Sequence, residues 1–352
     1  MSADPTSSPF LAACRGERPT RRPVWFQRQA GRSLPEYRAI RGTGSILHAV
    51  RDPALAAEIT LQPIRRYDTD AAILYSDIMV PIAAVGFGVD IKTGIGPVAE
   101  KPFRSRADLD RVRPLEPDHD LPYVAETVRL LVRELSVPLI GFAGAPFTVA
   151  SYLIEGGPSR TYTKTKALML GDPELFRELL SRLAQHAVAS LRAQIAAGAS
   201  VVQVFDSWAG ALHPAHYERY VLPHTRAVFA GVADLGVPRI HFGVTTGELL
   251  ALMATAGVEV VGVDWRVPLD AARARVPTHI SLQGNLDPAV ILAGWPQVQV
   301  EATDILRRNG AHHGHIFNLG HGVLPESNPD VLARLAEFVH AQPVGSNVED
   351  QA

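Results

Sequence analysis

Apolar residues along this chain gather in short runs that end in small or polar residues, and segments with helical spacing separate most of the runs. The runs are rich in residues that favour strands. Because they are apolar almost throughout, they predict strands covered on both faces, as in a parallel sheet. The seven runs are residues 71–76, 138–143, 201–205, 240–244, 258–263, 279–283 and 315–319.

The clearest helix between these runs opens at Asp172 and Pro173, a pair typical of a helix start. It ends near Gly198, and the run at 201–205 follows almost at once. The face expected to be buried carries residues spaced four apart: Leu175, Leu179, Leu183 and Ala187.

Residues 24–27 supply a candidate eighth strand. Eight strands alternating with helices favour an α/β fold of the (β/α)8 TIM-barrel type over an open doubly wound sheet. Such barrels need about 250 residues, so the 352 residues fit one barrel with insertions. The sequence therefore predicts a single barrel domain over residues 9–343.

Two further features depart from the strand–helix alternation. Residues 86–103 contain Gly94, Gly96 and Pro97 and predict an inserted β-hairpin. The ends, residues 1–8 and 344–352, are expected to be flexible tails.

Composition narrows the classes of function. A formal net charge of −2 and a pI near 6.7 argue against a general binder of nucleic acid or membrane surfaces. The single cysteine, Cys14, excludes an intrachain disulfide and a multi-thiolate metal site. No secretory signal is recognisable at the N-terminus, and the longest apolar stretch, residues 78–89, is too short to span a bilayer. We therefore expect a soluble, cytoplasmic protein.

The barrel prediction locates the chemistry, because catalytic residues of such barrels lie at the C-terminal ends of the strands. Polar residues at those ends are Arg28, Asp77, Asp206, Ser207, Asp264, Asn285 and His321.

Arginine is unusually dense near the N-terminus, with eight arginines between residues 15 and 41 against Glu17 and Glu36. A solvated basic segment would explain them. However, Arg28 and Arg32 are spaced four apart beside a strand-like run, and arginine forks bind carboxylates bidentately. A ligand with several carboxylates would need arginines placed in this way to bind it.

Four other positions are candidates for a site. Asp77 follows the apolar run at 71–76, where it needs a cation, N–H donors or a ligand; a helix N-cap or a structural ion pair would serve equally. Tyr152 could place a hydroxyl in a cavity, although packing is the commoner role of a tyrosine. Ser207 lacks the glycine-flanked pattern of a serine nucleophile, so binding is its better interpretation. Glycines on both sides of His321 leave its ring free to face a ligand.

Several histidines lie close together near residue 315, which raises the question of a metal site. Their spacing matches no zinc pattern, and no Cys/His pair accompanies them. We therefore predict no metal.

Five segments, taken together and in order, resemble the uroporphyrinogen decarboxylase family. They are Arg-Gln-Ala-Gly-Arg at 28–32, Ser-Asp-Ile at 76–78, residues 144–157, Phe-Asp-Ser-Trp-Ala-Gly at 205–210, and Asn-Leu-Gly-His-Gly at 318–322. The match spans residues 23–329. One departure is Gln27, where the family usually has methionine; this position is expected to pack and not to react.

The resemblance implies a cofactor-free decarboxylase of porphyrin and haem biosynthesis, a (β/α)8 barrel that is usually a homodimer with facing clefts. Carried over by position, Arg28 and Arg32 bind substrate carboxylates, and Asp77 accepts hydrogen bonds from the pyrrole N–H groups. Tyr152 and Ser207 contact substrate. His321 binds a side-chain carboxylate.

The resemblance leaves the source of the proton open. Arg28 is a proposed proton donor, but arginine is a very weak acid with a pKa above about 12. A water molecule or a carboxylic acid of the substrate is the alternative donor, with Arg28 orienting it.

Two alternative functions remain at this point. One is a corrinoid- and zinc-dependent methyltransferase of the same superfamily, which usually needs histidine and cysteine ligands. The other is a non-catalytic tetrapyrrole-binding protein, which would bind the same ligand without releasing CO₂.

Overall fold

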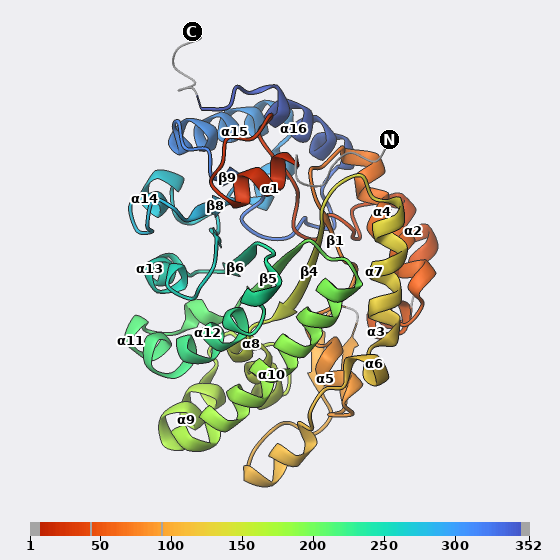
Figure 1. The fold of residues 1–352 in the computed structure, drawn as a ribbon, viewed down its shortest axis with the longest axis vertical. Coiled ribbons are helices and arrows are strands. Elements are labelled where there is room, and N and C mark those ends of the chain that lie inside the picture. The colour runs from red at the N-terminus through yellow and green to blue at the C-terminus, as the bar shows by residue number, and fades with distance from the viewer. Residues whose placement is uncertain (1–7, 43, 93, 346–352) are drawn as a thin grey trace.

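A curled sheet of seven parallel strands forms the centre of the molecule, with the helices arranged around it (Figure 1). This computed structural model describes residues 8–42, 44–92 and 94–345. Neighbouring strands follow in the order β1-β4-β5-β6-β7-β8-β9, so each strand pairs with the next strand of this sheet along the chain. The strands are β1 (Ala72–Ile73), β4 (Leu139–Gly144), β5 (Val201–Asp206), β6 (Arg239–Gly243), β7 (Val260–Gly262), β8 (Ser281–Gln283) and β9 (His315–Ile316).

The predicted eighth strand is present only as a single bridge, which closes the sheet between β9 and β1. Val24 bridges Phe317 in parallel register, and the Trp25 N–H donates to the Phe317 carbonyl at 3.2 Å. On the other side, the Asp70 N–H donates to the Val24 carbonyl at 2.8 Å. Pairing stops there because the chain turns at Arg28, whose φ of 57° is left-handed. The barrel prediction is confirmed, with its eighth strand shortened to this bridge.

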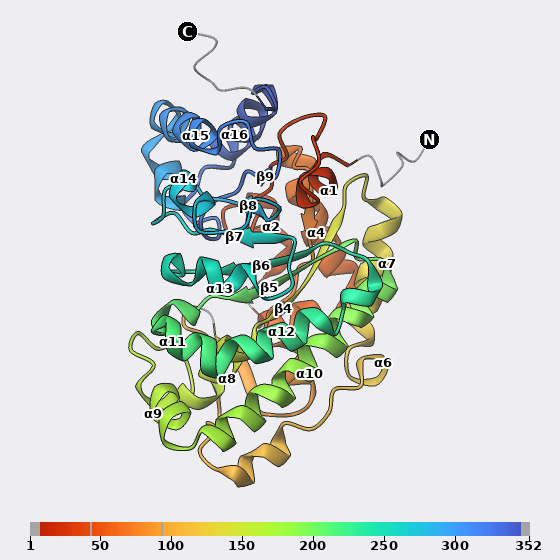
Figure 2. The same cartoon turned by 60° about the vertical axis from the view of Figure 1, so that its left-hand side comes forward.

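The helices cover the outside of the sheet in both views (Figures 1 and 2). Many begin with proline, whose missing N–H is not needed in the first turn. Their bounds are α1 (Pro9–Cys14), α2 (Pro35–Arg41), α3 (Ile46–Val50), α4 (Pro53–Tyr67), α5 (Val80–Ala84), α6 (Pro117–Asp120), α7 (Pro122–Glu134), α8 (Pro146–Glu155), α9 (Thr163–Gly171), α10 (Pro173–Ala197), α11 (Pro214–His216), α12 (Leu222–Ala230), α13 (Leu250–Ala254), α14 (Leu269–Arg273), α15 (Trp295–Asn309) and α16 (Pro329–Ala341).

The helix predicted after Asp172 is α10. The Asp172 side chain accepts from the Leu175 N–H at 3.0 Å and caps the helix, which ends at Gly198. The predicted apolar face is buried throughout, at Leu175, Leu179, Leu183 and Ala187.

The predicted inserted hairpin is also present. Strands β2 (Val89–Lys92) and β3 (Gly96–Ala99) pair antiparallel, apart from the barrel sheet. The expected tails lie almost entirely outside the described residues, at 1–7 and 346–352.

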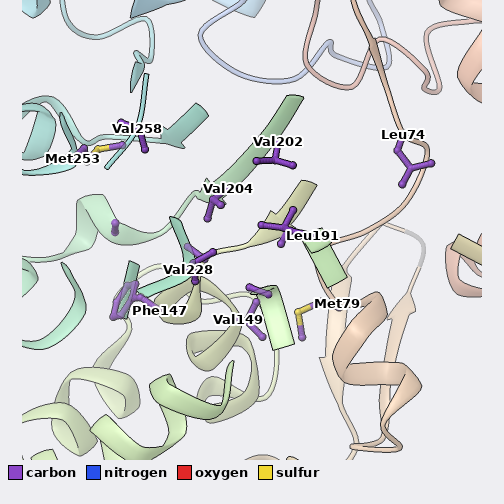
Figure 3. Close-up of a cluster of buried hydrophobic side chains, with 14 of the residues drawn as sticks. Leu74, Met79, Phe147, Val149, Leu191, Val202, Val204, Val228, Met253 and Val258 are labelled. Carbon is purple, nitrogen blue, oxygen red and sulfur yellow. The ribbon is translucent and has the colours of Figure 1, made fainter. Parts of the chain in front are cut away.

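Successive residues of the strands enter two different apolar clusters, as the twofold period of a strand requires. Val202 and Val204 of β5 belong to the large cluster shared with the helices, together with Leu191 of α10 and Val228 of α12 (Figure 3). Val201 belongs instead to a smaller cluster formed by residues near the starts of the strands.

Helix α1 closes the N-terminal end of the barrel. Phe10, Leu11 and Cys14 are buried in the smaller cluster, beside Trp25. The Ser281 hydroxyl at the start of β8 donates to the Ala13 carbonyl at 2.7 Å and anchors the helix. This end of the barrel is therefore filled, which leaves the C-terminal ends of the strands for a site. No helix among the described residues is long and apolar enough to cross a membrane.

Candidate active site

Arg28 is presented by a tight turn at the C-terminal end of the closing segment. The buried Gln29 side chain holds this turn in place: its Oε1 accepts from the Phe26 N–H at 3.1 Å. Its Nε2 donates to the Ala71 carbonyl, also at 3.1 Å, beside β1. Arg28 itself is exposed. The glutamine of the Arg-Gln-Ala-Gly-Arg motif thus fixes the direction of the arginine before it.

The Asn-Leu-Gly-His-Gly segment after β9 packs against this turn. The Asn318 Oδ1 accepts from the Gln27 N–H at 3.0 Å, and the Val323 N–H donates to the Gln27 carbonyl at 2.8 Å. A Cβ added at Gly322 would lie 2.5 Å from the Cδ of Arg28. Glycine at 322 is therefore what lets the stem of Arg28 pass. Gln27 is buried in this packing, as expected.

Asp77 lies beyond the end of β1, on a turn that leads into α5. One carboxylate oxygen accepts from the Met79 N–H at 2.9 Å, and Met79, not Asp77, is the N-cap residue of the helix. No salt bridge joins Asp77 to another described residue. Burial raises the pKa of the Asp77 carboxyl, while the Met79 N–H and the Arg28 charge act in the opposite direction. Asp77 is therefore neither a simple N-cap nor a member of a structural ion pair.

Tyr152 on α8 lies within range of the charges of Asp77 and Arg28. Burial raises the pKa of its phenol; the charge of Asp77 raises that pKa further, and the charge of Arg28 lowers it. Its ring lies against the Trp208 indole, with ring centroids 3.8 Å apart. The Tyr162 ring also packs on Trp208, with ring centroids 5.0 Å apart. Tyr152 thus lies within range of the charges of Asp77 and Arg28, and its ring packs on an aromatic group.

Ser207 follows β5 and is half-buried. Its position is set by its neighbours: the buried Asp206 accepts from the Thr148 hydroxyl at 2.9 Å, and that hydroxyl accepts from the Trp208 N–H at 3.3 Å. The Ser207 hydroxyl has no hydrogen bond to another described residue. Asp206 is therefore a structural acid, and Ser207 is the residue left available to a ligand.

Burial lowers the pKa of the His321 imidazole to about 4; the charges of Arg28 and Arg266 act in the same direction, and the charge of Asp264 acts in the opposite one. The ring is therefore neutral near pH 7. Its Nδ1 accepts from the Gly322 N–H at 2.6 Å, so the proton of the neutral ring is on Nε2. The geometry therefore leaves the Nε2–H of His321 as its hydrogen-bond donor.

The arginines of residues 15–41 have different roles. Several are structural: Arg21 pairs with Asp70 at 2.8 Å, and Arg22 donates to the Pro343 carbonyl at 2.7 Å. Arg41 donates to the Tyr75 hydroxyl at 3.0 Å, close to Asp77 in the chain. Arg32 is exposed, and no hydrogen bond or salt bridge joins its side chain to another described residue. Arg21 and Arg22 are therefore held by partners and do not belong to a solvated basic segment, and no contact joins Arg32 to Arg28.

A family model described as uroporphyrinogen decarboxylase (URO-D) matches residues 5–342. The uroporphyrinogen decarboxylase of Salinispora tropica is 60% identical over 338 residues, which cover 96% of this chain and 91% of that protein. The uroporphyrinogen decarboxylase of Thermobifida fusca is 59% identical over 336 residues, which cover 95% of this chain and 93% of that protein.

The chain belongs to the uroporphyrinogen decarboxylase family.

Solved structures agree with the fold of this family member. A methyltransferase from Methanosarcina mazei superposes with a TM-score of 0.74 at 18% identity, covering 95% of this chain and 97% of that one. A B12-independent methionine synthase from Shewanella gives a TM-score of 0.56 at 12% identity, covering 82% and 87%. At these identities the likeness concerns the fold alone.

The sequence did not predict several aromatic residues that lie at the C-terminal end of the barrel. Trp208 and Tyr162 pack against Tyr152, and Trp265 lies 6.3 Å from His321 between ring centroids. The available signal was an aromatic residue directly after a polar strand end, as in Ser207-Trp208 and Asp264-Trp265. Cys14 is buried in α1, at the opposite end. Within the described ranges, no group of three or more His, Cys, Asp or Glu side chains could hold a metal ion.

Proposed function

We propose that this protein is a carboxy-lyase that converts the four acetate side chains of uroporphyrinogen III to methyl groups, giving coproporphyrinogen III and four CO₂. The observation that carries the proposal is the placement of Arg28 and Asp77. The two residues lie at the open end of the barrel, Arg28 on the turn held by Gln29 and Asp77 on the turn beyond β1. Membership of the family supports the same reaction.

The reaction needs an electron sink, and the pyrrole ring is its own. Protonation of the ring carbon next to the acetate-bearing carbon creates a ring cation. The C–CO₂ bond then breaks, its electron pair enters the ring system, and CO₂ leaves with an exocyclic methylene left behind. A proton adds to the methylene, and the ring carbon loses its extra proton. Each acetate therefore consumes one net proton and becomes a methyl group.

Asp77 is the group we assign to the ring cation. Its second carboxylate oxygen has no partner among the described residues, so it is available to accept from the pyrrole N–H groups. An ionised carboxylate held by a backbone N–H in a partly dry site stabilises a developing positive charge without reorganising. Arg28, on the turn after the closing segment, binds a substrate carboxylate and donates or orients the proton.

The remaining residues bind the substrate in this proposal. Arg28 and Arg32 bind carboxylates as forks, and His321 donates from Nε2 to another carboxylate. Tyr152 and Ser207 contact the macrocycle. Support comes from the exposed guanidinium groups and from the unpartnered Ser207 hydroxyl.

The proposal includes three further statements taken from the family resemblance. No cofactor takes part, because the substrate ring serves as the electron sink. The enzyme acts as a cytoplasmic protein. It forms a homodimer with facing clefts, which sedimentation equilibrium would test directly.

The deciding experiment incubates the purified protein anaerobically, with chelator and without added cofactor, with uroporphyrinogen III. The porphyrinogens are then oxidised and separated by carboxylate number. We expect porphyrin with four carboxylates and release of CO₂. Unchanged porphyrin with eight carboxylates from a folded protein that binds it would favour a tetrapyrrole carrier. Activity that disappears with chelator and returns with zinc would contradict the cofactor-free reaction.

A further inference from the structure

The corner after β7 holds an arginine that the proposed function does not yet use. The Arg266 guanidinium lies over the Trp265 indole, 3.9 Å from the ring centroid, and its Nη1 donates to Asp264 Oδ2 at 2.8 Å. The Asp264 side chain is 1% exposed, whereas that of Arg266 is 45% exposed. A buried acid and an aromatic ring thus fix a cation whose outer side is open.

Hydrogen bonds hold this corner in place, and it packs directly on the segment that carries His321. The Asn285 Nδ2 donates to the carbonyls of Asp264 and Val267, at 2.9 and 2.7 Å. A Cβ added at Gly320 would lie 2.3 Å from the Trp265 nitrogen, so the two backbones touch. Asp264 and Asn285, predicted at the strand ends, therefore serve to hold the corner.

Arg266 shares its surroundings with two residues of the proposed site. The Trp265 and His321 rings lie 6.3 Å apart between centroids. The charges of Arg28 and Arg266 lower the pKa of the His321 imidazole, and the charge of Asp264 raises it. The glycines on either side of His321 contact the backbone of Trp265 and the side chain of Arg28, so Arg28, His321 and Arg266 lie next to one another at the open end of the barrel.

The hydrogen bonds of the corner leave donors free for a ligand. Asp264 accepts from the backbone N–H groups of Thr245 and Arg266 as well as from the guanidinium. A guanidinium has five N–H donors, and only the Nη1 bond to Asp264 is formed with a described residue. The remaining N–H groups of Arg266 can donate to a ligand carboxylate while Asp264 holds the guanidinium in its orientation.

We propose that Arg266 is a substrate-binding residue that takes a side-chain carboxylate of the tetrapyrrole beside the one bound by His321. This inference rests on the proposed function. A polycarboxylate needs several cations, and a preoriented arginine loses less freedom on binding than a mobile one.

The competing explanation is a structural ion pair that only stabilises the corner. The two roles differ in what they change: loss of a binding cation raises KM, whereas loss of a structural pair lowers the melting temperature and kcat. We therefore compare Arg266→Gln and Arg266→Lys with Arg307→Gln. Arg307 is a matched control, since its side chain is 46% exposed and pairs with Asp304 at 2.7 Å on the outer helix α15.

Steady-state kinetics with uroporphyrinogen III are measured together with thermal unfolding. Arg266→Gln is expected to raise KM about ten-fold, with kcat within about twofold of wild type and an unchanged melting temperature. Arg266→Lys should fall between wild type and Gln, and the KM difference should shrink with added salt. The control should match wild type.

An unchanged KM for Arg266→Gln would overturn the inference, as would a fall in kcat and melting temperature without a change in KM. A wild-type protein that releases no CO₂ would instead contradict the proposed function. The two failures are therefore distinguishable.

Discussion

The two ends of the barrel are built from the same strands but filled in opposite ways. At the N-terminal end, α1 places Phe10 and Leu11 against the apolar starts of the strands, and the cluster has little contact with solvent. At the C-terminal end, the Asp77 carboxylate accepts only from the Met79 N–H among the described residues, and no hydrogen bond or salt bridge joins the Arg28 side chain to another described residue. Unpartnered charge is unfavourable in a core and is useful only where a ligand arrives. One end thus contributes stability, and the other keeps its polar groups available for chemistry.

This comparison predicts that truncation at the filled end affects stability and not substrate binding. Phe10→Ala removes a fully buried ring, and such changes reduce the free energy of unfolding by about 3–5 kcal/mol. Denaturant unfolding gives this value, and KM of the folded fraction should be unchanged. Phe338→Ala, on the partly buried side of α16, is the control with a smaller expected loss. A raised KM without loss of stability would contradict the division of roles.

At the open end, Arg32→Lys should weaken substrate binding by about 1–3 kcal/mol, since lysine keeps the charge but loses the fork. The measurement is KM for uroporphyrinogen III, with unfolding as a check of the fold. Arg129→Lys is a suitable control, because Arg129 is exposed on α7 and pairs with Glu126. If KM is unchanged, Arg32 does not bind substrate.

The pH dependence should separate Asp77 from an ordinary carboxyl group. Burial raises its pKa, so protonation removes the anion at a higher pH than for an exposed aspartate. Activity should therefore fall as the pH decreases through this raised pKa and be fully present above it. The measurement is kcat against pH at saturating substrate. An acid limb at or below the usual aspartate range, about pH 4, would contradict the assignment.

The smallest effect is expected for Cys14 at the filled end. Burial raises the pKa of its thiol, and the charge of Glu259 adds to this, so little thiolate exists in the native protein. A thiol reagent should leave activity unchanged and react only after unfolding. Rapid labelling of the native enzyme would show that α1 opens easily.

The sequence predicted the strands of the barrel because their short runs are apolar almost throughout. It also located the hairpin, from Gly94, Gly96 and Pro97. The eighth strand was overestimated, since only the left-handed turn at Arg28 shows where pairing stops. Helix α1 was not anticipated, because six residues are too few to show a helical period.

The candidate site was less predictable than the fold. Strand ends located Arg28, Asp77 and His321, but the approach of Tyr152 to them depends on the packing of α8. The contact of Arg266 with Trp265 depends on the path of the corner after β7, which no periodicity encodes. The resemblance to the family suggested the role of each site residue. The structure adds the contacts of these residues, which the mutations above can test.

The most direct test of the account is CO₂ release by Asp77→Asn under saturating uroporphyrinogen III, with binding of the substrate measured in parallel. The asparagine keeps the shape and the hydrogen bond from Met79 but removes the charge. We predict a loss of turnover of about 100-fold or more, comparable to removing a preorganised electrostatic group, with the fold and substrate binding retained. Turnover close to that of the wild type would show that Asp77 does not stabilise the ring cation and would contradict the proposed mechanism.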